Sequence, residues 1–220
     1  MKTPDYGIIR EEDVTGITTT RLLPGEKAAG GLFHKQTAFG SITGNSLPQA
    51  DAELLTTGMF EGRQAANGNP IRNHCGAVCA ANIAILFYEA GWKKALIDED
   101  AEKTFFDLHG RLGNGPVLTL KGKLEEYFAL RGFSLRSRSV GDYENLCREI
   151  DAGHPVAVLL SAGLFQWHWV LAVGWFEIGS SENAEPRRFI RITDNWNPEA
   201  DRAIEIQKGS LWVAGRAYWL

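Results

Sequence analysis

The sequence predicts an α+β fold in which an N-terminal helical half packs on a C-terminal antiparallel β-sheet. Helix-like patterns fill the chain from residue 76 to residue 152, and most strand-like patterns follow Gly153. Separate runs of helices and strands favour this class over an alternating βαβ arrangement. The length of 220 residues, 44% of them hydrophobic, is enough for one domain core. We expect residues 61–220 to form the main domain and residues 1–60 an N-terminal extension.

The extension is rich in Gly and Thr and carries only short apolar runs, which predicts turns and a few short strands. Three roles stay open for residues 1–60: a pro-segment-like region that covers a cleft, a substrate-binding extension, or strands that complete the sheet. Residues 62–74 are rich in Asn, Gly and Pro. This composition predicts an irregular surface loop that leads to Cys75.

The first predicted helix spans residues 76–90 and is Ala-rich, almost uncharged and followed by Gly91. A helix without a polar face is buried, and a glycine after its last turn is a common C-cap. Three amphipathic segments should pack on this helix, at residues 98–112, 119–131 and 141–152.

The predicted strands are short apolar or β-branched runs that come after Gly153. A polar stretch at residues 179–188 reads as the loop of a hairpin. The five strands are residues 155–161, 168–176, 188–194, 203–207 and 216–220.

Cys75 is the predicted nucleophile, because it stands where the surface loop meets the buried helix. The start of a helix offers unpaired N–H groups and a partial positive charge, which lower a thiol pKa and can hold an oxyanion. The alternative is that Cys75 is a small buried apolar side chain. Cys79 and Cys147 are expected to take that structural role.

The three cysteines match neither a disulfide framework nor paired CxxC zinc ligands. A metal site built from Cys75, Cys79 and His168 lacks a fourth ligand in the sequence. We therefore predict neither a metal nor any other cofactor.

His168 is the predicted base, since imidazole titrates near neutrality and can take and return the thiol proton. It opens a predicted strand and is flanked by Trp167 and Trp169, which can shelter a charged pair from water. The alternative is a hydrogen-bonded core histidine. The other histidines fall in a loop, a helix, a turn and the extension: His74, His109, His154 and His34.

Asp194 is the predicted orienting residue. If residues 168–176 and 188–194 pair as a hairpin, His168 falls opposite Asp194, whose side chain can then accept the imidazole N–H. The alternative is that Asp194 caps the turn that follows it. For the oxyanion, the loop before Cys75 offers four amide side chains, and their positions do not choose among them: Gln64, Asn67, Asn69 and Asn73.

Three segments resemble the papain-like cysteine peptidases, in particular the bacterial double-glycine leader peptidase-like branch (bacteriocin-processing type). They are NHCGAVCAANIAILFY, GHPVAVLLSAGLFQWHWVLAVGW and ITDNW, and the resemblance covers about residues 69–197. It implies a papain-like fold with Cys75 as nucleophile, His168 as base and Asp194 as the orienting residue. It also implies Asn69 as the oxyanion donor, where the family usually has Gln; Gln64 and Asn73 stay alternatives.

The expected activity is cleavage of a peptide or amide bond through a thioacyl-enzyme, as in a cysteine peptidase. One alternative is an acyltransferase or transglutaminase-type enzyme, in which an amine replaces water. Another is a catalytically silent relative that binds peptides. Trp167, Trp169 and Trp196 are candidates for lining the cleft beside His168.

A formal charge of −4 with well-mixed signs gives no reason to expect a nucleic-acid partner. No signal-peptide-like or membrane-spanning stretch is visible, so we expect a cytoplasmic protein without membrane insertion, with export by a signal-independent route left open. The expected partner is a peptide or protein substrate. Its specificity and the oligomeric state stay open.

Overall fold

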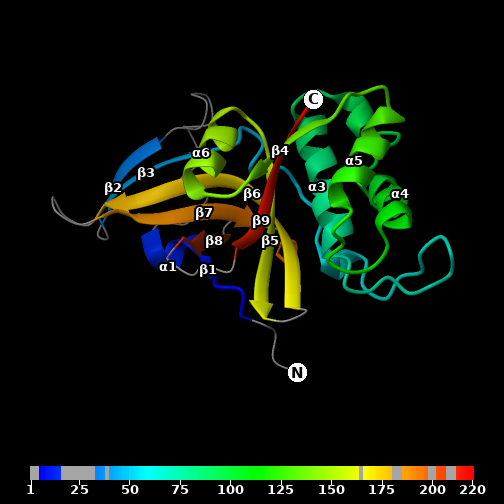
Figure 1. The fold of residues 1–220 in the computed structure, drawn as a ribbon, viewed down its shortest axis with the longest axis horizontal. Helices are drawn as coiled ribbons and strands as arrows, with labels where there is room; N and C mark the ends of the chain where they lie inside the picture. The colour runs from blue at the N-terminus through cyan, green and yellow to red at the C-terminus, as the bar shows by residue number, and fades with distance from the viewer. Residues whose placement is uncertain are drawn as a thin grey trace.

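The helices and the sheet form two adjoining parts of the molecule, as in an α+β protein (Figure 1). Helices α3, α4 and α5 gather on one side, and the strands extend away from them on the other. The computed structural model describes residues 5–15, 33–37, 40–163, 166–179, 185–197, 202–206 and 212–220. Among these residues, no helix is both long enough and apolar enough to cross a membrane.

The four predicted helices are confirmed, each within a few residues of its expected bounds. In chain order the helices of the described residues are α1 (Glu11–Thr15), α3 (Cys75–Glu89), α4 (Ala101–Leu112), α5 (Leu120–Ala129) and α6 (Tyr143–Asp151), with short 3₁₀ turns at Thr57–Met59 and Lys93–Ala95. Helix α3 is buried over residues 75–87, as its lack of a polar face predicts.

The helix starts differ in how their first N–H groups are satisfied. Asp100 caps α4 by accepting from the Lys103 N–H at 2.9 Å, and Asp142 caps α6 by accepting from the Asn145 N–H at 2.7 Å. Helix α3 has His74 at the cap position, with no side-chain cap hydrogen bond. The first N–H groups of α3 therefore stay available to another acceptor.

The sheet of the described residues has nine strands, and every pairing is antiparallel. Seven strands follow the order β1-β8-β7-β6-β5-β9-β4, while β3 also pairs with β6 and β2 pairs with β3. The strands are β1 (Ile8–Arg10), β2 (Phe33–Thr37), β3 (Gly40–Ser46), β4 (Arg136–Val140), β5 (Val156–Gly163), β6 (Gln166–Gly179), β7 (Arg187–Thr193), β8 (Arg202–Glu205) and β9 (Trp212–Trp219).

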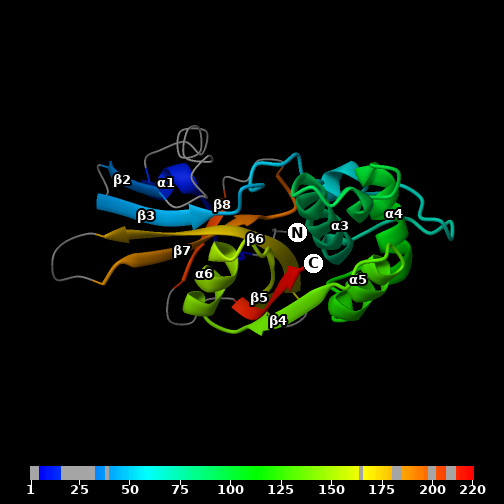
Figure 2. The same ribbon diagram turned by 90° about the horizontal axis from the view of Figure 1, so that it is seen from above.

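Strand β6 pairs with three other strands. Along one of its edges the N-terminal part pairs with β5 and the C-terminal part pairs with β3, and β7 pairs along the other edge. A Cβ on Gly174 would lie 2.7 Å from Ser46 Oγ and 2.8 Å from Asn45 O, so β3 approaches β6 where there is no side chain. Helix α6 packs across β3, β5 and β6, and α3 packs on β6 (Figure 2).

The predicted strands after Gly153 and the hairpin of β6 with β7 are confirmed; residues 180–184 of the predicted hairpin loop lie outside the described residues. Strand β4 was not predicted, because its sequence RSRSV has no apolar alternation. In the region 1–60, β1 pairs with β8 and β3 pairs with β6. These pairings favour strands that complete the sheet among the three roles considered for that region.

Candidate active site

Cys75 is the first residue of α3, and its side chain is buried, with 2% of the residue exposed. The main-chain N–H groups of Trp169, Gly76 and Cys75 itself lie near the sulfur and act to lower its pKa. Two of these N–H groups belong to the uncapped start of α3, and the third belongs to β6. The thiol therefore lies at the junction of the helix and the sheet, next to the residue that follows His168.

Gly76 allows this close approach. A Cβ at this position would lie 2.9 Å from Val117 Cγ2, 3.3 Å from Gly115 O and 3.5 Å from Trp169 Cδ1. The neighbouring segment is held in turn, because Trp169 Nε1–H donates to Val117 O at 3.1 Å and Gly115 N–H donates to Asn73 O at 2.5 Å. Only glycine fits between α3 and these neighbours without displacing one of them.

His168 lies on β6 and is buried, with 3% of the residue exposed. Its Nε2 lies 2.7 Å from the main-chain carbonyl oxygen of Asp194, so this nitrogen carries the hydrogen and donates. The neutral ring then keeps its lone pair on Nδ1. The Trp196 indole stacks on the imidazole, with ring centroids 3.8 Å apart and planes 7° from parallel.

The Asp194 carboxylate makes the turn contacts that were considered as the alternative. Its Oδ1 accepts from the main-chain N–H groups of Trp196 and Asn197, both at 2.9 Å, and its Oδ2 accepts from Asn197 Nδ2 at 2.7 Å. Asp194 does contact the predicted base, but through its carbonyl. The reason is register: Leu171 pairs with Thr193, which places His168 beyond the last pair of the β6–β7 ladder.

Asn195 ties this turn to the helix and the sheet, a role that we did not predict. Its Nδ2 donates to Trp169 O at 2.7 Å, and its Oδ1 accepts from Asn82 Nδ2 at 3.0 Å. Asn82 also bonds both the N–H and the carbonyl of Leu55. A lone amide in the apolar α3 sequence was the available signal, because a buried polar group needs partners.

Burial controls the protonation of both candidate catalytic groups. It raises the pKa of the Cys75 thiol, although the three N–H groups act in the opposite direction. It lowers the pKa of His168 to about 4, against the contacts with Asp194. The expected lowering of the thiol pKa is therefore wrong for this structure, in which the thiol and the imidazole are both neutral at pH 7. No hydrogen bond of the described residues joins the thiol to the imidazole.

Tyr6 covers the site, and no local pattern in the sequence indicated it. Only 7% of this residue is exposed, and its ring centroid lies 5.4 Å from that of His168 and 5.8 Å from that of Trp196. Burial raises the Tyr6 pKa, and the charge of a Cys75 thiolate acts in the same direction. The side chain thus covers the imidazole and the neighbouring indole.

The predicted oxyanion donor Asn69 lies elsewhere. It is exposed and lines a cavity of about 220 Å³ together with His109 and Asn114. Among the described contacts, none joins Cys75 to the side chain of Asn69 or of the alternatives Gln64 and Asn73. The N–H groups around the sulfur are the donors that the structure offers to an oxyanion.

The remaining cysteines are structural, as expected. Cys79 is fully buried, and its thiol donates to Val170 O, which lies 3.7 Å from the sulfur. Cys147 is half-buried on α6, and burial raises its pKa to about 12. In the described part of the chain, no group of three or more His, Cys, Asp or Glu side chains is arranged to hold a metal ion.

The other histidines whose side chains are described make local contacts. His74 Nε2 lies 3.1 Å from Thr57 O, His109 Nε2 lies 2.9 Å from Asn114 Oδ1, and His154 Nδ1 lies 2.8 Å from Glu149 Oε2.

No protein-family model matches the chain, and no curated protein matches its sequence.

Proposed function

We propose that the chain is a papain-like cysteine hydrolase that cleaves peptide or amide bonds through a thioester on Cys75. One observation carries the proposal: the thiol lies at the uncapped start of α3, which packs against Trp169, the residue that follows His168 on β6. A nucleophile, several main-chain N–H groups and the strand that carries a histidine adjoin there. These are the groups that acyl transfer through cysteine requires.

His168 acts as the base through Nδ1, because its Nε2–H is held by the Asp194 carbonyl. This contact fixes the ring and its tautomer, which is the function of an orienting group in a catalytic triad. In the proposed triad the main-chain carbonyl of Asp194 orients His168. The Asp194 carboxylate acts indirectly, because it stabilises the turn that positions this carbonyl.

In the proposed reaction, the Cys75 Sγ–C bond forms as the thiol proton passes to His168 Nδ1. The N–H groups near the sulfur stabilise the negative carbonyl oxygen. The C–N bond then breaks, and the leaving nitrogen takes the proton from His168. Water adds to the thioester, with His168 accepting its proton and returning it to the sulfur, and the acid is released. Because both groups start neutral, proton transfer accompanies attack.

A tryptic digest of serum albumin tests this activity. We expect the protein to generate new peptide termini, detected by mass spectrometry, and expect Cys75→Ser and His168→Gln to abolish them. Cys147→Ser is the matched control, because it removes a half-buried thiol outside the site and should retain activity. Absence of new termini, together with Cys75 alkylation by iodoacetamide that is equal in Tyr6→Ala and Tyr6→Ala/His168→Gln, would reject the hydrolase and favour a silent peptide-binding protein.

Acyl transfer is the second candidate, favoured by the burial of Cys75 and by the burial of His168 against Tyr6. A site that excludes water lets an amine compete for the thioester. Adding a primary amine such as glycine amide to the digest distinguishes the two reactions. Transfer gives peptides extended by the amine in preference to free acids, whereas a hydrolase gives free acids at every amine concentration.

A further inference from the structure

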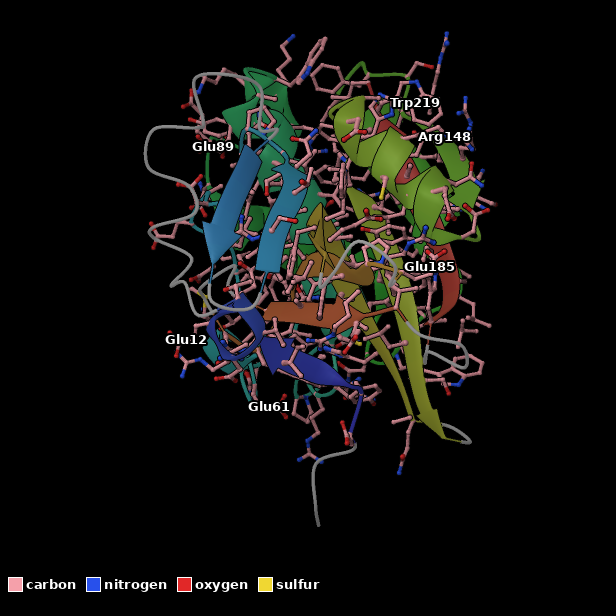
Figure 3. The ribbon with its side chains drawn as sticks, turned by 90° about the vertical axis from the view of Figure 1, so that its left-hand side faces the viewer. Glu12, Glu61, Glu89, Arg148, Glu185 and Trp219 are labelled. Atoms are coloured by element: carbon pink, nitrogen blue, oxygen red, sulfur yellow. The ribbon has the colours of Figure 1, made fainter. Side chains whose placement is uncertain are left out.

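Residues 5–10, here called the N-terminal strap, cross the candidate active site. The strap consists of a turn followed by β1, which pairs with β8 and is the border strand of the sheet that the described residues form (Figure 3). Gly7 has φ +67°, which a residue with a side chain rarely adopts, and its N–H donates to Asp5 Oδ1 at 2.8 Å. This turn directs Tyr6 toward His168 before the chain enters β1.

The chain is anchored immediately after the strap. Glu11 begins α1 and is fully buried, with its Oε1 2.6 Å from Nε of the buried Arg191 on β7. Figure 3 shows α1, marked by Glu12, directly beside β1. Contacts of the strap before this anchor include the three strand pairs with β8, the packing of Ile8 and Ile9 on the core clusters and the Tyr6 ring. Because α1 has its own buried anchor, the strap can leave the site while α1 keeps its place.

The strap borders a cavity next to the site. This cavity of about 230 Å³ lies between the strap and the turn that carries Asp194. Its lining comprises Asp5, Tyr6, Ile8, Asp194, Trp196 and Arg202. Part of this lining moves away with the strap, so departure of the strap enlarges the space beside the His168 and Trp196 rings.

We propose that the place of the Tyr6 ring is an aromatic side-chain subsite, which an extended peptide substrate occupies after the strap leaves. This inference rests on the proposed function and adds a substrate class to it. Stacked and tilted aromatic rings attract one another beyond their buried area, and the Trp196 indole and the His168 imidazole already form such a surface. The peptide backbone takes the place of β1 beside β8, by strand addition to an open sheet edge.

Alkylation of Cys75 by iodoacetamide measures closure by the strap. The thiolate carbon–sulfur bond forms as iodide leaves, and the proton passes to the buffer. We expect Tyr6→Ala to accelerate alkylation at least about tenfold over wild type, because loss of the ring uncovers His168 and opens a path for the reagent to the buried thiol. Tyr6→Phe is the matched control, since it keeps the ring and should stay within about twofold of wild type. Equal rates for Tyr6→Ala and wild type would overturn closure.

Two peptide-like reagents then measure the subsite in Tyr6→Ala. The chloromethyl ketones of N-acetyl-tyrosine and N-acetyl-alanine alkylate a thiol with loss of chloride and differ only in the side chain. We expect the tyrosine reagent to modify Cys75 about tenfold faster, and expect this preference to shrink in Tyr6→Ala/Trp196→Ala. Equal rates for the two reagents in Tyr6→Ala would reject the aromatic subsite.

These measurements separate this inference from the proposed function. If alkylation in Tyr6→Ala is fast and falls when His168→Gln is added, the nucleophile–base pair stands whatever the side-chain preference. If it is fast but independent of His168, the strap closes the site and the hydrolase proposal fails. If wild type and Tyr6→Ala are alkylated equally and both depend on His168, the strap proposal fails and the hydrolase remains.

Discussion

At the scale of single residues, burial outweighs the local electrostatics of the helix start. The three N–H groups around Cys75 lower its pKa, yet desolvation raises it by more. The same desolvation keeps His168 neutral beneath Trp196 and Tyr6. A charged thiolate–imidazolium pair is therefore disfavoured while the rings cover the site, and exposure to water is what favours it.

The neutral His168 predicts acid sensitivity. An unfolded histidine binds a proton below about pH 6.5, whereas His168 in the folded chain does so only near about pH 4. Its contribution is fully present above about pH 6.5 and is lost as the pH falls toward 4. Urea unfolding at pH 7 and pH 4.5 should show a loss for wild type that exceeds the loss for His168→Gln by on the order of 2 kcal/mol. Equal losses would contradict the buried neutral ring.

Asp194→Ala separates the two functions of that residue. The variant keeps the carbonyl that accepts from His168 and removes the carboxylate that accepts from the turn. We expect the free energy of unfolding to fall by about 1–3 kcal/mol, measured by urea denaturation. With the protein still folded, the His168-dependent reactivity of Cys75 should change less than in His168→Gln. A loss of reactivity as complete as that in His168→Gln would restore the carboxylate as the orienting group.

At the scale of elements, the site depends on how the start of α3 is placed against β6. Asn195 and Asn82 bond each other and reach the carbonyl of Trp169 and the backbone of Leu55. These hydrogen bonds are buried. Losing any one of them leaves a buried polar group with no protein partner and no water to replace it. One network thus holds the turn after β7 on the helix that carries the thiol.

Gly76→Ala tests this placement. The added Cβ meets Val117 Cγ2 at 2.9 Å and Gly115 O at 3.3 Å, so either the start of α3 or the 115–117 segment must shift. We expect a loss of about 1–3 kcal/mol in the free energy of unfolding and a weaker dependence of Cys75 alkylation on His168.

Gly122→Ala in α5 is the matched control, because its Cβ meets nothing within 4 Å. The control should gain up to about 1 kcal/mol, since alanine favours a helix. Destabilisation of both variants by the same amount would show that space at Gly76 is not the cause.

Elements with a local signal were predictable, and elements held by distant partners were not. Helix α3 is predictable from its local sequence, which is an apolar run that ends near Gly91. Strand β4 has exposed polar residues and exists because β9 pairs with it. The predicted Cys75 lies where α3 packs on β6, the strand that carries His168, but the register that gives Asp194 its contacts depends on the ladder from Leu171 onward. Tyr6 reaches the site through pairing with β8, which no short pattern encodes.

At the scale of the whole molecule, a buried ion pair fastens the N-terminal part of the chain to the sheet. Glu11 and Arg191 are 0% and 3% exposed at their side chains, and Arg191 Nη1 also donates to Ser46 Oγ at 3.1 Å. The pair thereby links α1, β7 and β3. It fixes the point from which the strap extends toward the active site.

Removing one partner of this ion pair should strongly destabilise the protein. Arg191→Met leaves the Glu11 carboxylate buried and should lower the free energy of unfolding by about 3–5 kcal/mol. The double variant Glu11→Leu/Arg191→Met removes both charges and should recover most of that loss, as measured by urea denaturation. A double variant as unstable as the single one would show that packing, and not the uncompensated charge, is responsible.

The position of β9 between β5 and β4 has a consequence for synthesis of the protein. Residues 212–219 fill an interior place in the sheet, so β4 lacks its neighbour until they have left the ribosome. The pairing of β1 with β8 likewise joins residues almost two hundred positions apart. Such contacts close large loops and form slowly. The helices can form while the chain is still being made, whereas the sheet, and the site that lies against it, are completed only after β9 is released.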